Sequence, residues 1–472
     1  MSATNPNLSE QTKPPDLIRA LGLWSATAIV IGDTIGTGIF LVTSDMARAV
    51  GTATLVFAAW IIGGLIVLCG AFCYAELGAA FPHAGGPYVY LNRGLGPLWG
   101  FLFGWMSSFL ERPVAMATLA AGFLRFVGFL FPVVAAPIFA FDLGGYIFTV
   151  TAAQPLAALV VLAVTAINYL SVRFGGAIQI VLTSLKMGTI AVIVVAGVLY
   201  GKHAATGAAP PITHLGLGTI SGLLTALVPA MWAYNGFNDL GDVGEEIAHP
   251  QKNIPRAILL GLLTVAGLYL LANVIYFRTL PFAALAQSQH LASDVVQTFA
   301  GSRGAVWLTV AMAVSALGAL HVVTLTGARI PYAMARDGVF FPFAKRIHPT
   351  FRTPGGALVF LGSAAALLAL SGTYEELYSL FVFAVWIFFA LTAIALFRLR
   401  RTEPHLPRPY RALGHPWTTL LFLAAAVALT VNLWMVRPVR SSLGLAVILA
   451  GVPFFYHWRR PAGGSFRSGR KS

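Results

Sequence analysis

The chain has 472 residues, of which 58% are hydrophobic and only 10% are charged, and its mean hydropathy is +0.80. A soluble domain carries about 25% charged residues, so this composition excludes a soluble globular protein and predicts an integral membrane protein. The formal net charge of +14 would suit a nucleic-acid-binding protein, but the placement of the basic residues argues against that class.

Twelve apolar segments follow one another along the chain. Several have no charged residue over about the 20 residues that a helix needs to cross roughly 30 Å of hydrocarbon, for example 257–277 and 377–397. They are rich in Leu, Ala, Val and Gly without alternation of polar and apolar residues, which favours helices over a β-barrel. The sequence therefore predicts an all-α membrane protein with spans at 20–45, 52–77, 96–130, 151–170, 174–200, 217–243, 256–278, 304–335, 355–372, 376–398, 416–436 and 441–458.

The basic residues concentrate in alternate connections between these spans. With the N-terminus inside, the inner segments carry most of them, whereas the outer loops hold far fewer. This asymmetry is the positive-inside pattern of a multi-pass protein. We expect a plasma (inner) membrane location with both termini cytoplasmic, a disordered tail at 1–19 and a basic tail at 459–472.

Three connections have signals of their own. Residues 81–96 combine Pro, a Gly-Gly pair and aromatics, which predicts a short interfacial helix with a turn. Residues 337–354 and 398–416 are basic, and the second has four prolines, so both are predicted as cytoplasmic connectors. The two cysteines, Cys69 and Cys73, lie one turn apart in the second span and are interpreted as small packing residues, not as a disulfide or metal site.

The first span is interrupted by GDTIGTGIF at residues 32–40. Gly36 and Gly38 let the backbone leave helical geometry and let a ligand approach closely. The N–H groups of Thr37, Gly38 and Ile39 would then lack i−4 partners and form an anion site at the start of a half-helix, with the Thr37 hydroxyl as a further donor. The alternative for Gly32 and Gly36 is a small-residue face for helix packing.

The sixth span is interrupted by WAYNGFND at residues 232–239. Carbonyls exposed from Trp232 to Asn235 would accept hydrogen bonds from an ammonium group. Donors in the first span and acceptors in the sixth together fit a zwitterion, the backbone of an α-amino acid. Trp232 would cover the substrate as an aromatic lid, unless it is an ordinary packing residue.

The two interruptions occupy corresponding places in two five-helix halves. Irregular backbone at membrane depth is tolerated where it lines a cavity or is buried in protein. Paired interruptions of this kind point to the substrate site of a transporter built from inverted repeats. We expect one transporter domain at 20–458, with repeats at 20–200 and 217–398 and two extra helices within 416–458.

Three motifs make the resemblance specific: the sequence at 32–40, the run from Tyr74 to Trp105, and WAYNGFNDLGDVGEEIAHPQKNIPRAI at 232–258. In collinear order they resemble the amino acid–polyamine–organocation superfamily, with most similarity to the L-type amino acid transporter light chains and their prokaryotic relatives. The resemblance implies a twelve-helix LeuT-type fold with broken helices 1 and 6 and alternating access to a site at the midplane.

The resemblance also implies roles for individual residues. The substrate carboxylate would bind the amides of Thr37 and Gly38, and the ammonium the carbonyls of Thr34, Trp232 and Asn235, with Trp232 as the gate. The expected substrate-binding residues, Gly36 included, are Thr34, Gly36, Thr37, Gly38, Trp232 and Asn235.

Lys186 is a lone cation deep in the fifth span, where an ammonium costs about 2.5–3.5 kcal/mol or more and needs a partner. In the family, a lysine at this place reaches the broken first helix and the eighth helix and stands where sodium-coupled relatives hold a cation. Lys186 could therefore couple substrate occupancy to gating or release a proton. Asp33 departs from the family pattern, and it could pair with a cation, carry a proton or favour a cationic substrate.

Other charged residues have weaker signals. Glu111 and Arg112 in the third span are predicted to be an internal ion pair or a helix kink. Glu245 and Glu246, with Arg329 and Arg336, are candidates for ion pairs of an inner gate.

The sequence thus predicts a sodium-independent amino acid transporter, exchanging neutral amino acids. The alternative is a proton-coupled symporter of cationic amino acids or polyamines. Neither an enzyme nor a channel is expected, because no HExxH, Ser-His-Asp set or filter loop is present, and no cofactor or metal is expected. Residues 131–150 contain no cysteine for a disulfide-linked heavy chain, so we expect the protein to work alone in the lipid bilayer.

Overall fold

The structure is a computed structural model, and it describes residues 19, 21–83, 85–143, 146–170, 175–201, 217–351, 353–371 and 373–459. Both predicted tails lie almost entirely outside the described residues. Helices dominate, in the order α1 Leu23–Thr34, α2 Gly38–Val50, α3 Ala53–Ala80, α4 Gly86–Gly94, α5 Pro97–Met106, a π-helical segment η1 Ser107–Glu111, α6 Arg112–Leu130, α7 Ala153–Leu170, α8 Gly175–Tyr200, α9 Leu217–Ala233, α10 Pro250–Thr279, α11 Phe282–Gln287, α12 Leu291–Gly327, α13 Arg329–Arg336, α14 Gly355–Ser371, α15 Tyr374–Thr402, α16 Trp417–Val436 and α17 Pro438–Arg459, with short 3-10 turns η2 Pro132–Ala135, η3 Asp239–Glu246 and η4 Pro342–Lys345.

Nine helical stretches of the described chain are long and apolar enough to cross a membrane. The pair α1 and α2 adds a broken span, bent by 42°, and two shorter apolar helices, Gly218–Ala233 and Gly355–Ser371, coincide with predicted spans. The chain is therefore a multi-pass membrane protein. Helix α12 starts at Leu291 and is kinked at Gly301, whose φ is 67°, so the span predicted from residue 304 corresponds to the part of α12 after the kink.

The prediction of an all-α fold needs one correction, between α6 and α7. Strands β1 Pro137–Leu143 and β2 Tyr146–Thr151 pair antiparallel, with Leu143 opposite Tyr146 and Phe139 opposite Val150. The segment is rich in aromatic and β-branched residues, and the sequence places two glycines between the strands, a combination that favours a hairpin over a loop.

The predicted connectors are largely confirmed. The segment at 81–96 contains α4, which begins after Gly85 and Gly86, both with positive φ. The segment at 398–416 differs, because α15 continues to Thr402 before the chain leaves the helix. Cys69 and Cys73 are both buried and unbonded to each other, as expected for packing residues.

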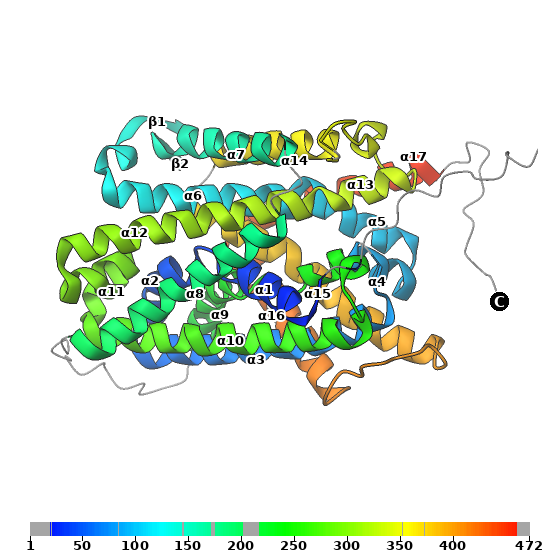
Figure 1. The fold of residues 1–472 in the computed structure, drawn as a ribbon, viewed down its shortest axis with the longest axis horizontal. Helices are drawn as coiled ribbons and strands as arrows, with labels where there is room; N and C mark the ends of the chain where they lie inside the picture. The colour runs from blue at the N-terminus through cyan, green and yellow to red at the C-terminus, as the bar shows by residue number, and fades with distance from the viewer. Residues whose placement is uncertain are drawn as a thin grey trace, which may run out of the picture.

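The helices run roughly along the long axis of the molecule (Figure 1). In one layer α6 packs against α12 and α14, and in the other α10 packs against α1 and α3. The short helices α1 and α2 lie between the layers, and α2 packs on α9. This arrangement brings the two interrupted spans together in the interior of the protein.

Candidate functional site

The first interruption is present where the glycines predict it. Helix α1 ends at Thr34, the N–H of Gly36 bonds back to the Thr34 carbonyl at 2.9 Å, and α2 begins at Gly38 with Thr37 as its N-cap. The first N–H groups of a helix have no i−4 carbonyl to bond. The amides at the start of α2 are therefore free to bind an acceptor group of a ligand.

The second interruption is longer than the first. Helix α9 ends at Ala233, the chain turns through residues 234–238, and η3 continues to Glu246 with non-helical dihedral angles at Val243. The N–H of Asn235 reaches only the carbonyl of Trp232, at 3.3 Å. The Tyr234 N–H still bonds to the Ala230 carbonyl at 2.9 Å, so Asn235 is the first residue whose N–H leaves the regular α-helical pattern, and the Trp232 carbonyl accepts an i+3 bond instead of an i+4 bond.

Glycines allow the two interruptions to touch. A Cβ atom on Gly236, whose φ is 121°, would lie 2.8 Å from the Asp33 carbonyl carbon and from the Thr34 nitrogen. A Cβ on Gly38 would lie 2.7 Å from the Cα of Ala233. Close packing is therefore part of the role of Gly38, alongside the conformational freedom that the sequence predicted.

Tyr269 of α10 joins the two interruptions from behind. Its hydroxyl lies 3.0 Å from the carbonyl oxygen of Thr34 and 3.0 Å from that of Ala233, so its single proton is shared between the last residues of the two half-helices. Sequence reasoning missed this residue, because a tyrosine inside an apolar span has no local signal that distinguishes it from a packing aromatic.

A cavity lies where the interruptions meet, with about 40 Å³ of space for the centres of water molecules. One water needs about 10–15 Å³ on this measure, so the cavity has room for a few waters and must widen to admit an amino acid. All six predicted substrate-binding residues line it, and so does Asp33. Its full lining is Asp33, Thr34, Gly36, Thr37, Gly38, Glu111, Arg112, Ala115, Leu119, Trp232, Ala233, Asn235, Gly236, Asp239, Val323 and Phe381.

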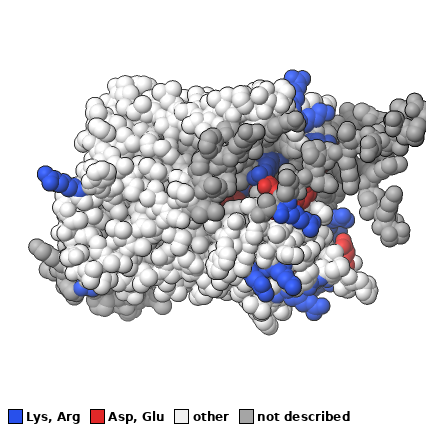
Figure 2. Space-filling model, in the orientation of Figure 1, with Lys and Arg blue, Asp and Glu red and all other residues white. Residues whose placement is uncertain are grey.

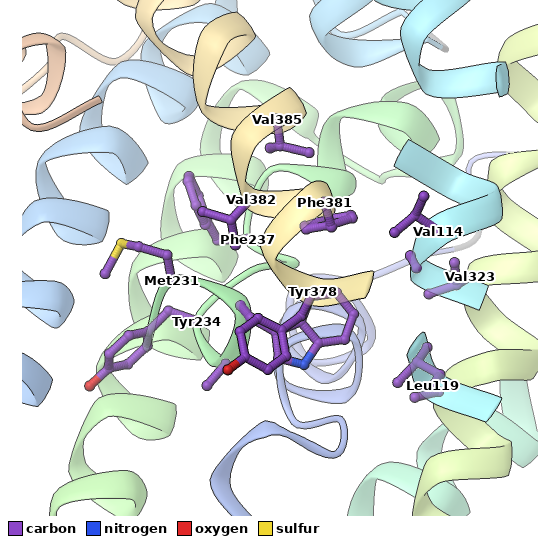
Figure 3. Close-up of a cluster of buried hydrophobic side chains, with 14 of the residues drawn as sticks. Val114, Leu119, Met231, Tyr234, Phe237, Val323, Tyr378, Phe381, Val382 and Val385 are labelled. Atoms are coloured by element: carbon purple, nitrogen blue, oxygen red, sulfur yellow. The ribbon is translucent and has the colours of Figure 1, made fainter. Parts of the chain in front are cut away.

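The apolar wall of the cavity comes from helices far apart in sequence. Figure 3 shows Val114 and Leu119 of α6, Val323 of α12 and Phe381 of α15 around the site, and Leu119, Val323 and Phe381 line the cavity. Trp232 packs edge-to-face on Phe381 with ring centroids 5.0 Å apart. A side chain entering this space would meet aliphatic and aromatic surface on three sides.

A hydrogen-bonded set closes one side of the cavity. The Tyr374 hydroxyl lies 2.9 Å from the Thr37 hydroxyl and accepts a hydrogen bond from Trp232 Nε1 at 3.0 Å. Arg125 covers the Tyr374 ring and pairs with Glu375 at 2.5 Å. The Thr37 hydroxyl, predicted as a ligand donor, is thus engaged by Tyr374, a residue that the sequence did not single out.

Arg112 closes the other side and corrects a prediction. It does not pair with its neighbour Glu111 but donates to Asp239 at 2.6 Å and to Asp242 at 2.9 Å. The reason is the π-helical segment that ends at Glu111, together with the unwound sixth span that brings both aspartates to α6. The predicted irregularity of this helix is confirmed, whereas the predicted internal ion pair was wrong.

One predicted inner-gate ion pair is present. Arg329 lies 3.0 Å from Glu246, and both side chains are partly exposed. Glu245 instead lies 3.8 Å from His83. Within the described residues Arg336 forms no ion pair with either glutamate.

Lys186 is buried and reaches the first interruption. Its Nζ donates to the Gly32 carbonyl at 2.6 Å, and its charge interacts with Asp33. Lys186 does not line the cavity itself. The predicted contact with the broken first helix is present, but no hydrogen bond from Nζ to α12 occurs among the described residues.

The profile of the amino acid permease family matches residues 21–455. The chain belongs to this family. The permease is therefore a transporter of the amino acid–polyamine–organocation superfamily and not an enzyme, and amino acids are its substrate class.

Three relatives place the permease among known transporters. It is 32% identical to the human b(0,+)-type amino acid transporter 1 over 418 residues, which are 85% of this chain and 80% of the relative. It is 28% identical to the serine/threonine exchanger SteT of Bacillus subtilis, over 95% of this chain and 99% of the relative. It is 32% identical to the rabbit large neutral amino acids transporter small subunit 2, over 93% of this chain and 80% of the relative.

Proposed function

We propose that this permease is a sodium-independent exchanger of neutral amino acids that works by alternating access. The observation that carries the proposal is the cavity between the two interrupted spans, which has free amides on one side and non-helical carbonyls on the other. The names of SteT, an exchanger of serine and threonine, and of the large neutral amino acids transporter support the choice of neutral substrates.

The substrate backbone would bind to peptide groups. Its carboxylate would accept hydrogen bonds from the amides of Thr37 and Gly38, where the dipole of α2 favours an anion. Its ammonium would donate to the carbonyls of Thr34, Trp232 and Asn235. The Thr34 carbonyl already accepts from the Gly36 N–H at 2.9 Å and from the Tyr269 hydroxyl at 3.0 Å, so one of these two bonds would give way when the ammonium binds.

The transport cycle would open the two closed sides in turn. The set around Tyr374 would separate to open one side, and the Arg112 and Arg329 ion pairs would separate to open the other. Because Lys186 bonds to the Gly32 carbonyl, movement of the first helix would move the lysine side chain with it. Its ammonium group would take the place of a sodium ion there, which is the basis for sodium independence.

The membrane arrangement follows from the same reasoning. The broken span and the two shorter apolar helices would complete twelve spans in a LeuT-type inverted repeat. Most Lys and Arg on the face in Figure 2 gather toward the end where α13 and α17 are labelled in Figure 1. By the positive-inside rule this end would face the cytoplasm, with both termini inside the plasma membrane. The protein would work without a disulfide-linked heavy chain.

A second candidate is a proton-coupled symporter of cationic amino acids or polyamines. Three acidic side chains, Asp33, Glu111 and Asp239, line the cavity and favour this candidate. Of these three side chains, only Asp239 forms an ion pair among the described residues, with Arg112 at 2.6 Å.

Uptake into proteoliposomes tests the two candidates. Purified protein would be reconstituted with or without internal amino acid, in sodium or in choline buffer, and offered labelled neutral or cationic amino acids. The exchanger predicts uptake that requires internal amino acid and is indifferent to sodium. Uptake of cationic substrates into empty vesicles, driven by an inwardly directed proton gradient, would instead establish the second candidate.

A further inference from the structure

The cavity wall and the residues packed against it hold more buried carboxyl groups than cations. In the part of the chain that the structure describes, the carboxyl groups of Asp33, Glu111, Asp239 and Asp242 share two buried cations, Arg112 and Lys186. Arg112 forms ion pairs with Asp239 and Asp242. Lys186 donates a hydrogen bond to the Gly32 carbonyl and interacts electrostatically with Asp33.

Glu111 is one of two cavity-lining carboxyl groups, with Asp33, that form no ion pair among the described residues. It is 2% exposed, and its Oε2 atom forms no hydrogen bond within the described residues. An uncompensated charge in the membrane interior is costly, and a carboxyl group can avoid that cost by binding a proton. Asp33 likewise has an unpartnered Oδ2 atom and no ion pair among the described residues, but its cationic neighbour Lys186 pairs with no other carboxylate there, whereas the cation beside Glu111 is Arg112, which already pairs with two aspartates.

The backbone around Glu111 also departs from a plain helix. Glu111 ends the π-helical segment that interrupts the long span from α5 to α6, and such segments are frequent at functional sites. In this segment the hydroxyls of Ser107 and Ser108 are both buried and lack a hydrogen-bond partner among the described residues. Glu111 itself lines the cavity, which has room for a few waters, so water in the cavity can reach its carboxyl group.

Charged and titratable groups surround Glu111 from several elements. Asp239 and Asp242 of η3 and Arg112 of α6 are the nearest, and Tyr74 of α3 also interacts with it. Asp33 of α1 lines the same cavity. Since Arg112 already pairs with two aspartates, a negative charge on Glu111 would face nearby carboxylates without a cation of its own.

We propose that Glu111 is a proton-binding site of the transport cycle, so that amino acid movement through this cavity requires a proton on its carboxyl group. When the cavity opens to one solution, a hydronium ion transfers its proton to Oε2 and leaves as water. When the cavity opens to the other solution, the O–H bond breaks and water takes the proton. This inference rests on the proposed transport function and adds a proton to it.

The test compares the pH dependence of amino acid exchange in proteoliposomes with equal pH on both sides. For the wild type we expect exchange to fall about tenfold per pH unit once Glu111 loses its proton, as expected for one essential acid. Glu111→Gln cannot lose a proton, so its ratio of rates between about pH 5.5 and about pH 8 should stay within about twofold, whatever its absolute rate.

Glu76→Gln is the matched control. Glu76 is a membrane-buried carboxylate away from the cavity, held by Arg400 at 2.5 Å and by Arg408 at 3.3 Å. This variant should be less stable than the wild type but keep the wild-type pH profile. If Glu111→Gln also keeps that profile, or if wild-type exchange does not change with pH, the proton inference is overturned while the transport function stands.

A second measurement needs no variant. Opening and closing around substrate should change proton occupancy, so amino acid added to lightly buffered wild-type protein should shift the signal of a pH dye. No shift at any pH would overturn the inference. Absence of amino acid exchange at every pH would overturn both the proposed function and the proton site.

Discussion

Replacing Tyr269 by Phe removes one hydroxyl from behind the two interrupted helices and leaves the ring in place. The hydroxyl lies 3.0 Å from the Thr34 and Ala233 carbonyl oxygens, and the Tyr269 side chain is fully buried. The ring packing on Trp60 and Tyr234, with centroids 5.4 Å apart in each case, is kept by Phe. The Thr34 carbonyl keeps its bond from the Gly36 N–H in this variant, so Ala233 is the acceptor that loses its partner. Loss of a hydrogen bond that leaves a buried acceptor unpaired costs about 1–3 kcal/mol.

Tyr276→Phe provides the comparison. Tyr276 is on the same helix, two turns further on, and is equally buried, but its hydroxyl has no hydrogen-bond partner among the described residues. Its removal should change the free energy of unfolding by less than about 0.5 kcal/mol, because no bond is lost. The two variants therefore differ in whether the deleted hydroxyl is bonded and not in volume.

The free energy of unfolding is measured by titrating the purified protein in mixed micelles with SDS while tryptophan fluorescence is recorded. The affinity for amino acids is measured on the same variants. We expect Tyr269→Phe to lower the free energy of unfolding by about 1–3 kcal/mol. We also expect weaker substrate binding, because the Thr34 carbonyl loses its orientation at the break. Equal behaviour of the two variants would refute the argument that this hydroxyl holds the half-helices together.

Three further variants test other parts of the site. Gly236→Ala forces a side chain into positive φ and against the first interruption, so it should cost about 2 kcal/mol or more and abolish transport, whereas Gly267→Ala, with open space around it, should keep transport. Lys186→Ala should stop exchange but leave substrate-induced thermal stabilisation, and full exchange would refute its coupling role. Trp232→Phe loses the bond to Tyr374 and should raise KM about fivefold, measured as counterflow; an unchanged KM would contradict the lid.

Local sequence signals were sufficient to predict where the first and sixth spans are interrupted. Gly36 and Gly38 in the first span, and Asn235 and Gly236 in the sixth, are residues that a continuous apolar helix does not favour, and the helices end beside them. Chain order then places the two segments in corresponding positions. The cavity found between them has every predicted substrate-binding residue in its wall, although their binding roles stay predictions.

Contacts between residues far apart in the chain could not be predicted from local sequence signals. Glu111 and Arg112 are adjacent in sequence, so an ion pair between them was the simple expectation, yet Arg112 turns to Asp239 and Asp242. Tyr374, more than three hundred residues from the Thr37 that it contacts, had no visible link to the site.

The sequence by itself determined the membrane class, the helical spans and the places where two of them break, because hydropathy and backbone preference are local properties. Only the tertiary structure decided which buried charges are compensated and which are not. That outcome depends on how helices far apart in the chain pack side by side. Among the described residues it leaves Glu111, unlike Asp239, facing the cavity without an ion pair of its own.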